Sequence, residues 1–203
     1  MTSDGFAICA IFRDEAPYLK EWIEFHIQEG AQHFYLYDNF STDNPEHVLR
    51  PFVNQGVVTL INWPVRFVDR GQEKAYDDCI KRSQSTCRWL VIIDIDEFLF
   101  SPQSNVGSIL QTMTDFPAVA VNTIYYGTNG HLKYLDQPVI DRFTRRAPLW
   151  WKRNLQRKLI LQPKSTLRAI TPHRFEFLVP GGTVNLRGFP EAKDKRLLAR
   201  FIY

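Results

Sequence analysis

The sequence predicts an α/β fold in which a mostly parallel central sheet has helices on both faces. Two observations support this prediction. Short apolar runs alternate with segments whose apolar residues recur at helical spacing, as in βαβ units. The apolar run at residues 89–100 ends in alternating carboxylates, which is expected where a buried strand reaches a ligand-binding edge. With 203 residues and 44% hydrophobic side chains, the chain can bury a substantial core, and we expect one domain.

The first half of the chain follows a regular alternation. Residues 6–12 predict the first strand, and Pro17 suits the first turn of the helix that comes next. Leu19 and Trp22 fall on one face of this helix, and Gly30 lies just past its end. The later elements of this half are a strand at 33–37, a short helix at about 45–54, a strand at 57–62, a helix at 72–84 and a strand at 90–93.

The second half is less regular, because proline and glycine separate short apolar segments. Ser104 is a suitable N-cap for a helix that carries Val106 and Ile109. The segment 142–174 is rich in arginine and lysine, which indicates a solvated basic face or, alternatively, a face that binds phosphate or carbohydrate. Strands are expected at 118–121, 158–161 and 174–179.

Three carboxylates close the central apolar run, at Asp94, Asp96 and Glu97. An unpaired buried carboxylate is costly, so these side chains should reach a cation or the edge of a cleft. Because side chains alternate along a strand, Asp94 and Asp96 point to one side while Ile95 returns to the core. Two such carboxylates can hold a hard divalent cation on oxygen ligands. The alternative is that Asp94 or Asp96 caps the next turn and Glu97 is solvated.

Composition and missing motifs exclude several classes of protein. The net charge of +3 is too balanced to argue for nucleic acid, and the three cysteines are expected to be buried thiols in a reducing compartment. No apolar stretch could span a bilayer and the first residues are not a signal peptide, so we expect a cytoplasmic protein, with peripheral membrane association left open. The chain lacks G-x-G-x-x-G after its first strand, a P-loop and a G-x-S-x-G elbow, which disfavours dehydrogenases, P-loop ATPases and hydrolases.

The sequence predicts different surroundings for two of the histidines. His26 lies on the apolar face of the first helix, so we expect a hydrogen-bonded core residue and not a ligand. His131 follows Gly130 in a loop that either faces an acceptor molecule or forms a plain turn.

Several segments together resemble a known family. The sequence ICAIFRDEAPYLKEWIEFH, at residues 8–26, is similar to the opening of glycosyltransferases in the family-92 (DUF23) group and its relatives near family 2. Weaker similarity continues through YYGTNGHLK, KLILQP and the histidine of TPH. The order and spacing of these segments are more specific than any one of them. Three further segments carry the resemblance, namely YLYDNFSTDN, RGQEKAYDDCI and LVIIDIDEFLF.

The resemblance implies a GT-A fold that binds a nucleotide-sugar with the help of Mn²⁺ or Mg²⁺. It implies a metal-dependent inverting hexosyltransferase that moves galactose, as the leading sugar, from a UDP-sugar to a glycan or glycoconjugate acceptor. Asp94 and Asp96 match the D-x-D metal motif, where the cation neutralises the departing diphosphate as a Lewis acid. His173 is expected as a further metal ligand, since GT-A enzymes commonly recruit a late histidine; a surface or strand-end position is the alternative.

The donor is expected to lie across the ends of the first two strands. Asp38 closes the second strand, where family members contact the nucleoside, and its carboxylate can accept hydrogen bonds from uracil or ribose. The expected donor-binding residues are Phe12, Arg13, Glu15, Asp38, Gln72, Asp94 and Ile95.

The general base and the acceptor side are less defined. An inverting reaction needs a carboxylate base, for which Glu176, Glu191 and Asp141 are unranked candidates. The chain stops without the further His-Tyr-rich segment of its relatives, so we expect a short or truncated member, with residues 1–100 as the nucleotide-sugar half and 101–203 as the acceptor-side half. Two other classes stay open: a non-catalytic sugar-nucleotide or glycan binder, and a metal-dependent nucleotidyl- or phosphotransferase using the same two aspartates.

Overall fold

Strands of two sheets form the framework of the molecule. A computed structural model describes residues 5–113, 116–133, 135–155, 157–179, 182–185 and 198–202. The strands are β1 (Phe6–Phe12), β2 (Ala31–Asp38), β3 (Val58–Asn62), β4 (Trp89–Ile92), β5 (Glu97–Phe100), β6 (Ala118–Tyr126), β7 (Arg157–Leu161), β8 (Thr166–Thr171), β9 (Arg174–Val179), β10 (Gly182–Asn185) and β11 (Leu198–Ile202). Eight strands form one sheet in the order β3-β2-β1-β4-β7-β6-β11-β5, and β10-β9-β8 form another.

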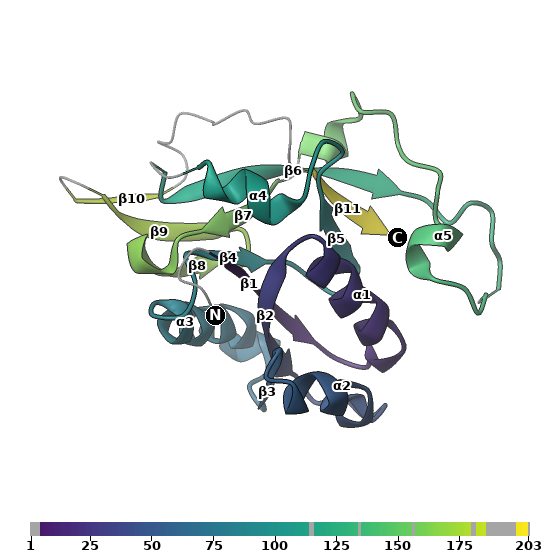
Figure 1. Cartoon of the computed structure of the whole chain (residues 1–203), viewed down its shortest axis with the longest axis horizontal. Helices are drawn as coiled ribbons and strands as arrows, with labels where there is room; N and C mark the ends of the chain where they lie inside the picture. The colour runs from purple at the N-terminus through teal and green to yellow at the C-terminus, as the bar shows by residue number, and fades with distance from the viewer. Residues whose placement is uncertain are drawn as a thin grey trace.

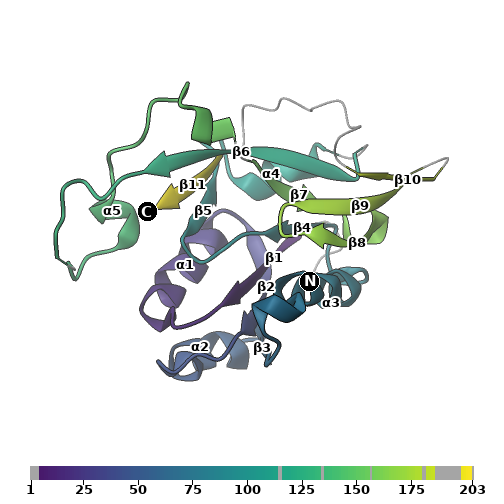
Figure 2. The same ribbon diagram turned by 180° about the vertical axis from the view of Figure 1, so that it is seen from behind.

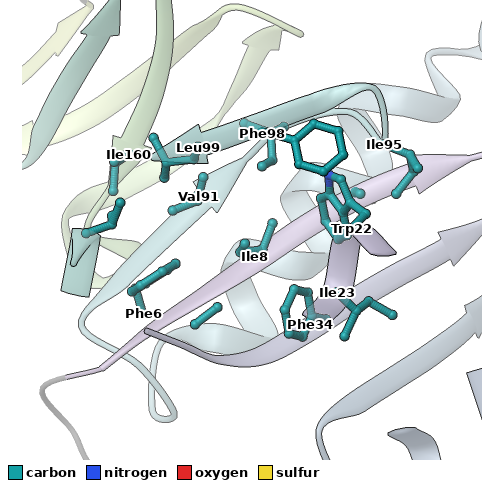
Figure 3. Close-up of a cluster of buried hydrophobic side chains, with 14 of the residues drawn as sticks. Phe6, Ile8, Trp22, Ile23, Phe34, Val91, Ile95, Phe98, Leu99 and Ile160 are labelled. Atoms are coloured by element: carbon teal, nitrogen blue, oxygen red, sulfur yellow. The ribbon is translucent and has the colours of Figure 1, made fainter. Parts of the chain in front are cut away.

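Helices cover both faces of the large sheet (Figures 1 and 2). The helices are α1 (Ala16–Gln28), α2 (Pro45–Asn54), α3 (Gly71–Ser83), α4 (Val106–Gln111) and α5 (Val139–Arg142), with 3₁₀ turns η1 (Phe67–Asp69), η2 (Lys152–Leu155) and η3 (Pro163–Ser165). Alternate side chains of β1 separate the two layers, because Ile8 packs in the cluster with α1, α2 and α4, whereas Cys9 packs in the cluster with α3 and the small sheet. Figure 3 shows part of the first cluster. The predicted α/β class is confirmed.

The order of the strands creates a switch point between β1 and β4. The strands β3, β2, β1 and β4 are mutually parallel, and the chain leaves β1 toward β2 on one side while β4 lies on the other. In such sheets, ligands bind in the crevice outside the carboxyl ends of the strands at that point. Beyond β4 the sheet is mixed, because β7 runs antiparallel to both β4 and β6.

Two of the differences from the sequence prediction concern α4 and the chain that follows the acidic residues. The N-cap of α4 is Asn105 and not Ser104: its Oδ1 accepts a hydrogen bond from the Ser108 amide at 3.3 Å while its amide group donates to the Gln28 carbonyl at 2.7 Å. The chain after the acidic residues also reverses into β5, a strand that the prediction did not contain, which pairs antiparallel with β11.

Other expectations agree with the structure. Cys9, Cys79 and Cys87 are buried free thiols. The basic segment 142–174 is solvated only in part, because Trp150 is 83% exposed whereas Arg142 and Lys158 are buried. In the part of the chain that the structure describes, no helix combines the length and the apolarity needed to cross a membrane.

Candidate functional site

Three carboxylates gather in the tight turn between β4 and β5. The Glu97 amide donates to the Asp94 carbonyl at 3.1 Å, and the Asp94 amide donates back to Glu97 Oε2 at 3.1 Å. One oxygen from each of Asp94, Asp96 and Glu97 falls within 4.8 Å of the others. Ile95 is buried, as predicted, although it lies in a turn and not in a strand. The turn therefore presents a carboxylate cluster at the switch point of the sheet.

A buried lysine that the sequence prediction missed lies against this cluster. Lys158 of β7 places its Nζ 3.0 Å from Asp94 Oδ2 and 3.1 Å from Glu97 Oε2. Glu97 is 1% exposed, so the alternative in which Glu97 is solvated is wrong. Burial alone would lower the pKa of Lys158, but the charges of Glu97 and Asp94 raise it, so the ammonium stays charged. The ammonium group therefore compensates part of the negative charge of Asp94 and Glu97.

Asp96 and Glu15 form the open, acidic part of the site. Asp96 is exposed, and partial desolvation together with the charge of Asp94 raises its pKa. Glu15 is half-buried; burial and then the charges of Asp96, Asp43 and Asp14 raise its pKa. Within the described ranges, the Glu15 carboxylate has no hydrogen-bond or ion-pair partner. It is thus free to contact a ligand.

A cavity of about 420 Å³ adjoins these two acids. Glu15 and Asp96 line one part of it, and the part of the chain from residue 128 to residue 143, which includes α5, lines another with Lys133 and Arg142. His131 also lines the cavity, and its Nε2 lies 3.2 Å from the Arg142 carbonyl oxygen. Its amide donates to the Thr128 carbonyl at 2.9 Å in a turn, and a position facing an acceptor stays a prediction. The cavity therefore joins an acidic wall to a basic wall.

The ends of β1 and β2 are connected by loop contacts. Asp14, whose φ of +55° is in the left-handed region, accepts from the Thr42 amide at 2.7 Å and donates its own amide to Ser41 Oγ at 3.0 Å. Asp38 Oδ1 accepts from the Ser41 amide at 3.0 Å. Arg13 is exposed and pairs only loosely with Asp14, at 3.5 Å. This edge is thus preorganised, with polar side chains facing outward.

Two predicted donor-binding residues occupy different surroundings. The Phe12 side chain is 3% exposed and packs in the apolar core, so it does not face the cleft. Gln72, near the start of α3, donates to the Tyr76 hydroxyl at 2.7 Å. Burial and then the charge of Asp94 raise the pKa of Tyr76. Gln72 is therefore engaged with a residue of its own helix.

The glycine that opens α3 has a structural reason. A Cβ at Gly71 would lie 2.7 Å from the Arg66 carbonyl oxygen, and backbone atoms cannot move aside as a flexible side chain can. The Trp63 indole donates to the Gly71 carbonyl at 2.9 Å, and this hydrogen bond also holds the loop close to the start of α3. Glycine here lets the loop before α3 pack closely against the start of that helix.

His173 lies near the cluster but outside its closest group. It is in the turn between β8 and β9, where burial and then the charge of Lys158 lower its pKa while Asp94 opposes the shift. One carboxylate oxygen from each of Asp94, Asp96 and Glu97 lies within 4.8 Å of the others, and His173 is not part of this group. Direct metal ligation by His173 stays a prediction.

The candidates for the general base occupy different places, and the choice among them stays a prediction. Glu176 binds Arg168, with Nε 2.7 Å from its Oε2, and lies in the small sheet. Asp141 lines a separate cavity of about 480 Å³ between α1 and α5. Glu191 lies outside the described residues.

These features define a class of protein and then a family. A Rossmann-like sheet with a carboxylate cluster at its switch point places that cluster where open α/β sheets bind their ligands. Within that class, the chain belongs to glycosyltransferase family 92, which its residues 4–171 match. Family membership and the sheet order together confirm the GT-A fold.

Individual relatives match part of the chain. A glycosyltransferase family 92 protein of Oryza sativa subsp. japonica is 38% identical over 99 residues, which cover 48% of this chain and 16% of that protein. The galactan beta-1,4-galactosyltransferase GALS2 of Arabidopsis thaliana is 28% identical over 106 residues, covering 48% of this chain and 20% of the relative. The crystal structure of S. aureus TarS 1-349 superposes with a TM-score of 0.48 at 14% identity, covering 78% of this chain and 47% of that one. This chain therefore spans only a fraction of the length of its curated relatives.

Proposed function

We propose that this chain is a metal-dependent inverting glycosyltransferase domain that transfers a hexose, with galactose favoured, from a UDP-sugar to a glycan acceptor. One observation carries the proposal: in a family-92 chain, Asp94 and Asp96 lie at the switch point, and Asp96 lines a cavity of about 420 Å³. The galactose preference is supported by the galactan beta-1,4-galactosyltransferases among the relatives.

The residues at the switch point fit a hard divalent cation. Asp94 uses Oδ2 to contact Lys158, and Asp96 is exposed, so both aspartates can offer oxygen atoms to Mn²⁺ or Mg²⁺. Glu97 is buried against Lys158 and holds the turn in place. When bound, the cation supplies Lewis-acid neutralisation of the diphosphate leaving group.

The remaining roles follow from the positions of the side chains. Asp38 and Arg13, at the ends of the first two strands, are in place to bind the nucleoside and a phosphate. Glu15 has the environment that a general base needs, because it is half-buried, has no partner among the described side chains and lines the cavity with Asp96. Burial, with acids around it, raises its pKa and so strengthens it as a proton acceptor. The acceptor hydroxyl would then lose its proton to Glu15 as its oxygen bonds to the anomeric carbon, while the bond from that carbon to the diphosphate oxygen breaks and UDP leaves.

A substrate screen tests this function. Release of UDP from UDP-galactose, UDP-glucose and UDP-N-acetylglucosamine is measured with Mn²⁺, with and without β-1,4-linked galacto-oligosaccharides. We expect acceptor-stimulated, Mn²⁺-dependent release that is fastest with UDP-galactose, and a product of inverted anomeric configuration. UDP binding without turnover would instead indicate a sugar-nucleotide binder, and turnover of nucleoside triphosphates a nucleotidyl- or phosphotransferase.

A further inference from the structure

Glu21 of α1 connects two parts of the molecule that are far apart in sequence. Its Oε2 accepts a hydrogen bond from the Val139 amide at 2.8 Å, and its Oε1 accepts one from the Ile140 amide at 3.1 Å. Figures 1 and 2 show α5 beside α1, on the side of the molecule away from α3. Hydrogen bonds to an ionised carboxylate are stronger than neutral ones, so this contact holds the start of α5 firmly against α1.

The segment held by Glu21 forms the basic wall of the 420 Å³ cavity. Val139, Arg142 and Phe143 all line that cavity. Arg142 is 6% exposed; its Nη1 donates to the Leu135 carbonyl at 2.8 Å, and its guanidinium lies 5.1 Å from the centre of the Phe143 ring. The segment is therefore one packed unit, and Glu21 holds the point where α5 begins.

The same helix also holds the acidic wall. Trp22, the neighbour of Glu21, donates from Nε1 to the Glu97 carbonyl at 2.8 Å. One turn later, His26 Nε2 accepts from the Leu99 amide at 3.0 Å. Adjacent residues of α1 thus contact the backbone of the carboxylate turn and of α5, so the helix fixes how far the two walls stand apart.

We propose that Glu21 is a positioning residue that sets the width of the cavity by holding α5, and so controls acceptor binding without contributing to the metal site. The inference rests on the proposed function, because it takes the cavity as the place where the acceptor meets the donor sugar. A purely structural Glu21 would instead change stability alone and leave substrate affinities as they are.

The test compares Glu21→Gln with Glu24→Gln. Glutamine keeps the size of the side chain but has a single acceptor oxygen for the two amides, and its NH₂ group opposes the other donor. Glu24 lies on the same helix, is exposed and contacts Lys20 at 3.9 Å, so it controls for the loss of a charge from α1. Hydrogen exchange of the amides of residues 135–143 reports on the wall, calorimetry with UDP and Mn²⁺ on the donor side, and transfer kinetics on the acceptor.

For Glu21→Gln, we expect exchange at residues 139 and 140 to accelerate about tenfold or more, as the loss of one charge-assisted hydrogen bond implies. The acceptor KM should rise about fivefold or more, while UDP affinity and acceptor-independent UDP-sugar hydrolysis follow the Glu24→Gln control. This pattern supports the proposal.

Three results overturn it: a wall that stays as protected as in the control, a loosened wall with an unchanged acceptor KM, or a loss of UDP affinity that matches the loss of transfer. If the wild-type chain transfers to no acceptor, the proposed function fails. The exchange comparison then decides on its own whether Glu21 holds the wall.

Discussion

At the scale of single residues, the ammonium group of Lys158 decides how three carboxylates can coexist. Glu97 is almost fully buried, and a buried carboxylate without a cation is costly. Lys158 satisfies Glu97 and one oxygen of Asp94 while Asp96 stays exposed. The buried pair of Lys158 and Glu97 holds the turn in place, and the exposed carboxylate of Asp96 remains accessible to a ligand.

Lys158→Met should therefore destabilise the fold by about 3–5 kcal/mol, because it leaves Glu97 as an uncompensated buried charge. Denaturant unfolding measures the change in the free energy of unfolding. Lys164→Met, at an exposed position of η3, serves as the control and should stay within about 0.5 kcal/mol of wild type. A Lys158→Met variant as stable as this control would show that the buried ion pair is unimportant.

Lys158 also shows where the sequence prediction stopped. Strand periodicity identified residues 158–161 as a strand but not its partner. The antiparallel register pairs Val91 with Ile160, and continuing it brings Lys158 level with the end of β4, next to Asp94. The sequence shows a lysine at the start of an apolar strand, which could have indicated a buried charge. Its partners, Asp94 and Glu97, become evident only from the pairing of β7 with β4, which are distant in sequence.

At the scale of elements, α1 stabilises the strand that carries Glu97. β5 is the last strand of its sheet, so one edge needs partners from elsewhere. His26 supplies one of them: its Nδ1 lies 2.7 Å from the Trp22 carbonyl oxygen and must donate to it, which leaves Nε2 as the acceptor for the Leu99 amide. The prediction that His26 is a hydrogen-bonded core residue is confirmed, because helical spacing alone indicates its buried face.

A buried neutral His26 predicts how stability depends on pH. Burial lowers the pKa of His26 from 6.5 to about 3, so between these values the unfolded chain binds a proton that the folded chain does not. The contribution of His26 is therefore fully present above the unfolded pKa and decreases as the pH falls, by up to about 1.4 kcal/mol per pH unit. Between pH 7 and about pH 4.5, wild type should lose about 2–3 kcal/mol more than His26→Gln, which cannot titrate. Equal pH profiles of the two proteins in denaturant unfolding would contradict this.

At the scale of the whole molecule, the sheet order brings distant segments to one edge. The prediction of parallel strands was sufficient to place the ends of β1, β2 and β4 together, because parallel strands of one sheet share a carboxyl edge. It could not provide the basic wall, since the segment between β6 and α5 has no period that predicts its path. The cavity therefore became visible only in three dimensions, where Arg142 and Asp96 line the same space.

Of the two aspartates, Asp96 gives the clearer test of the metal site. Asp94 also binds Lys158, so its substitution would disturb the buried pair as well as any bound ion. The Asp96 side chain is exposed and makes no hydrogen bond to another described residue, and its negative charge adds to that of Asp94. Asp96→Asn should therefore leave the stability of the metal-free protein within about 0.5 kcal/mol of wild type.

The same variant should lose the dependence of UDP binding on Mn²⁺, because it removes one of two charged oxygen ligands. Calorimetric titration of UDP with and without Mn²⁺ measures this, and the thermal shift that a ligand of the native state produces should disappear in parallel. Asp69→Asn, in the exposed turn η1, is a control that removes one acidic charge elsewhere on the surface. If Asp96→Asn keeps Mn²⁺-dependent UDP binding at the level of this control, the cation is held by other residues and the assignment of the site is wrong.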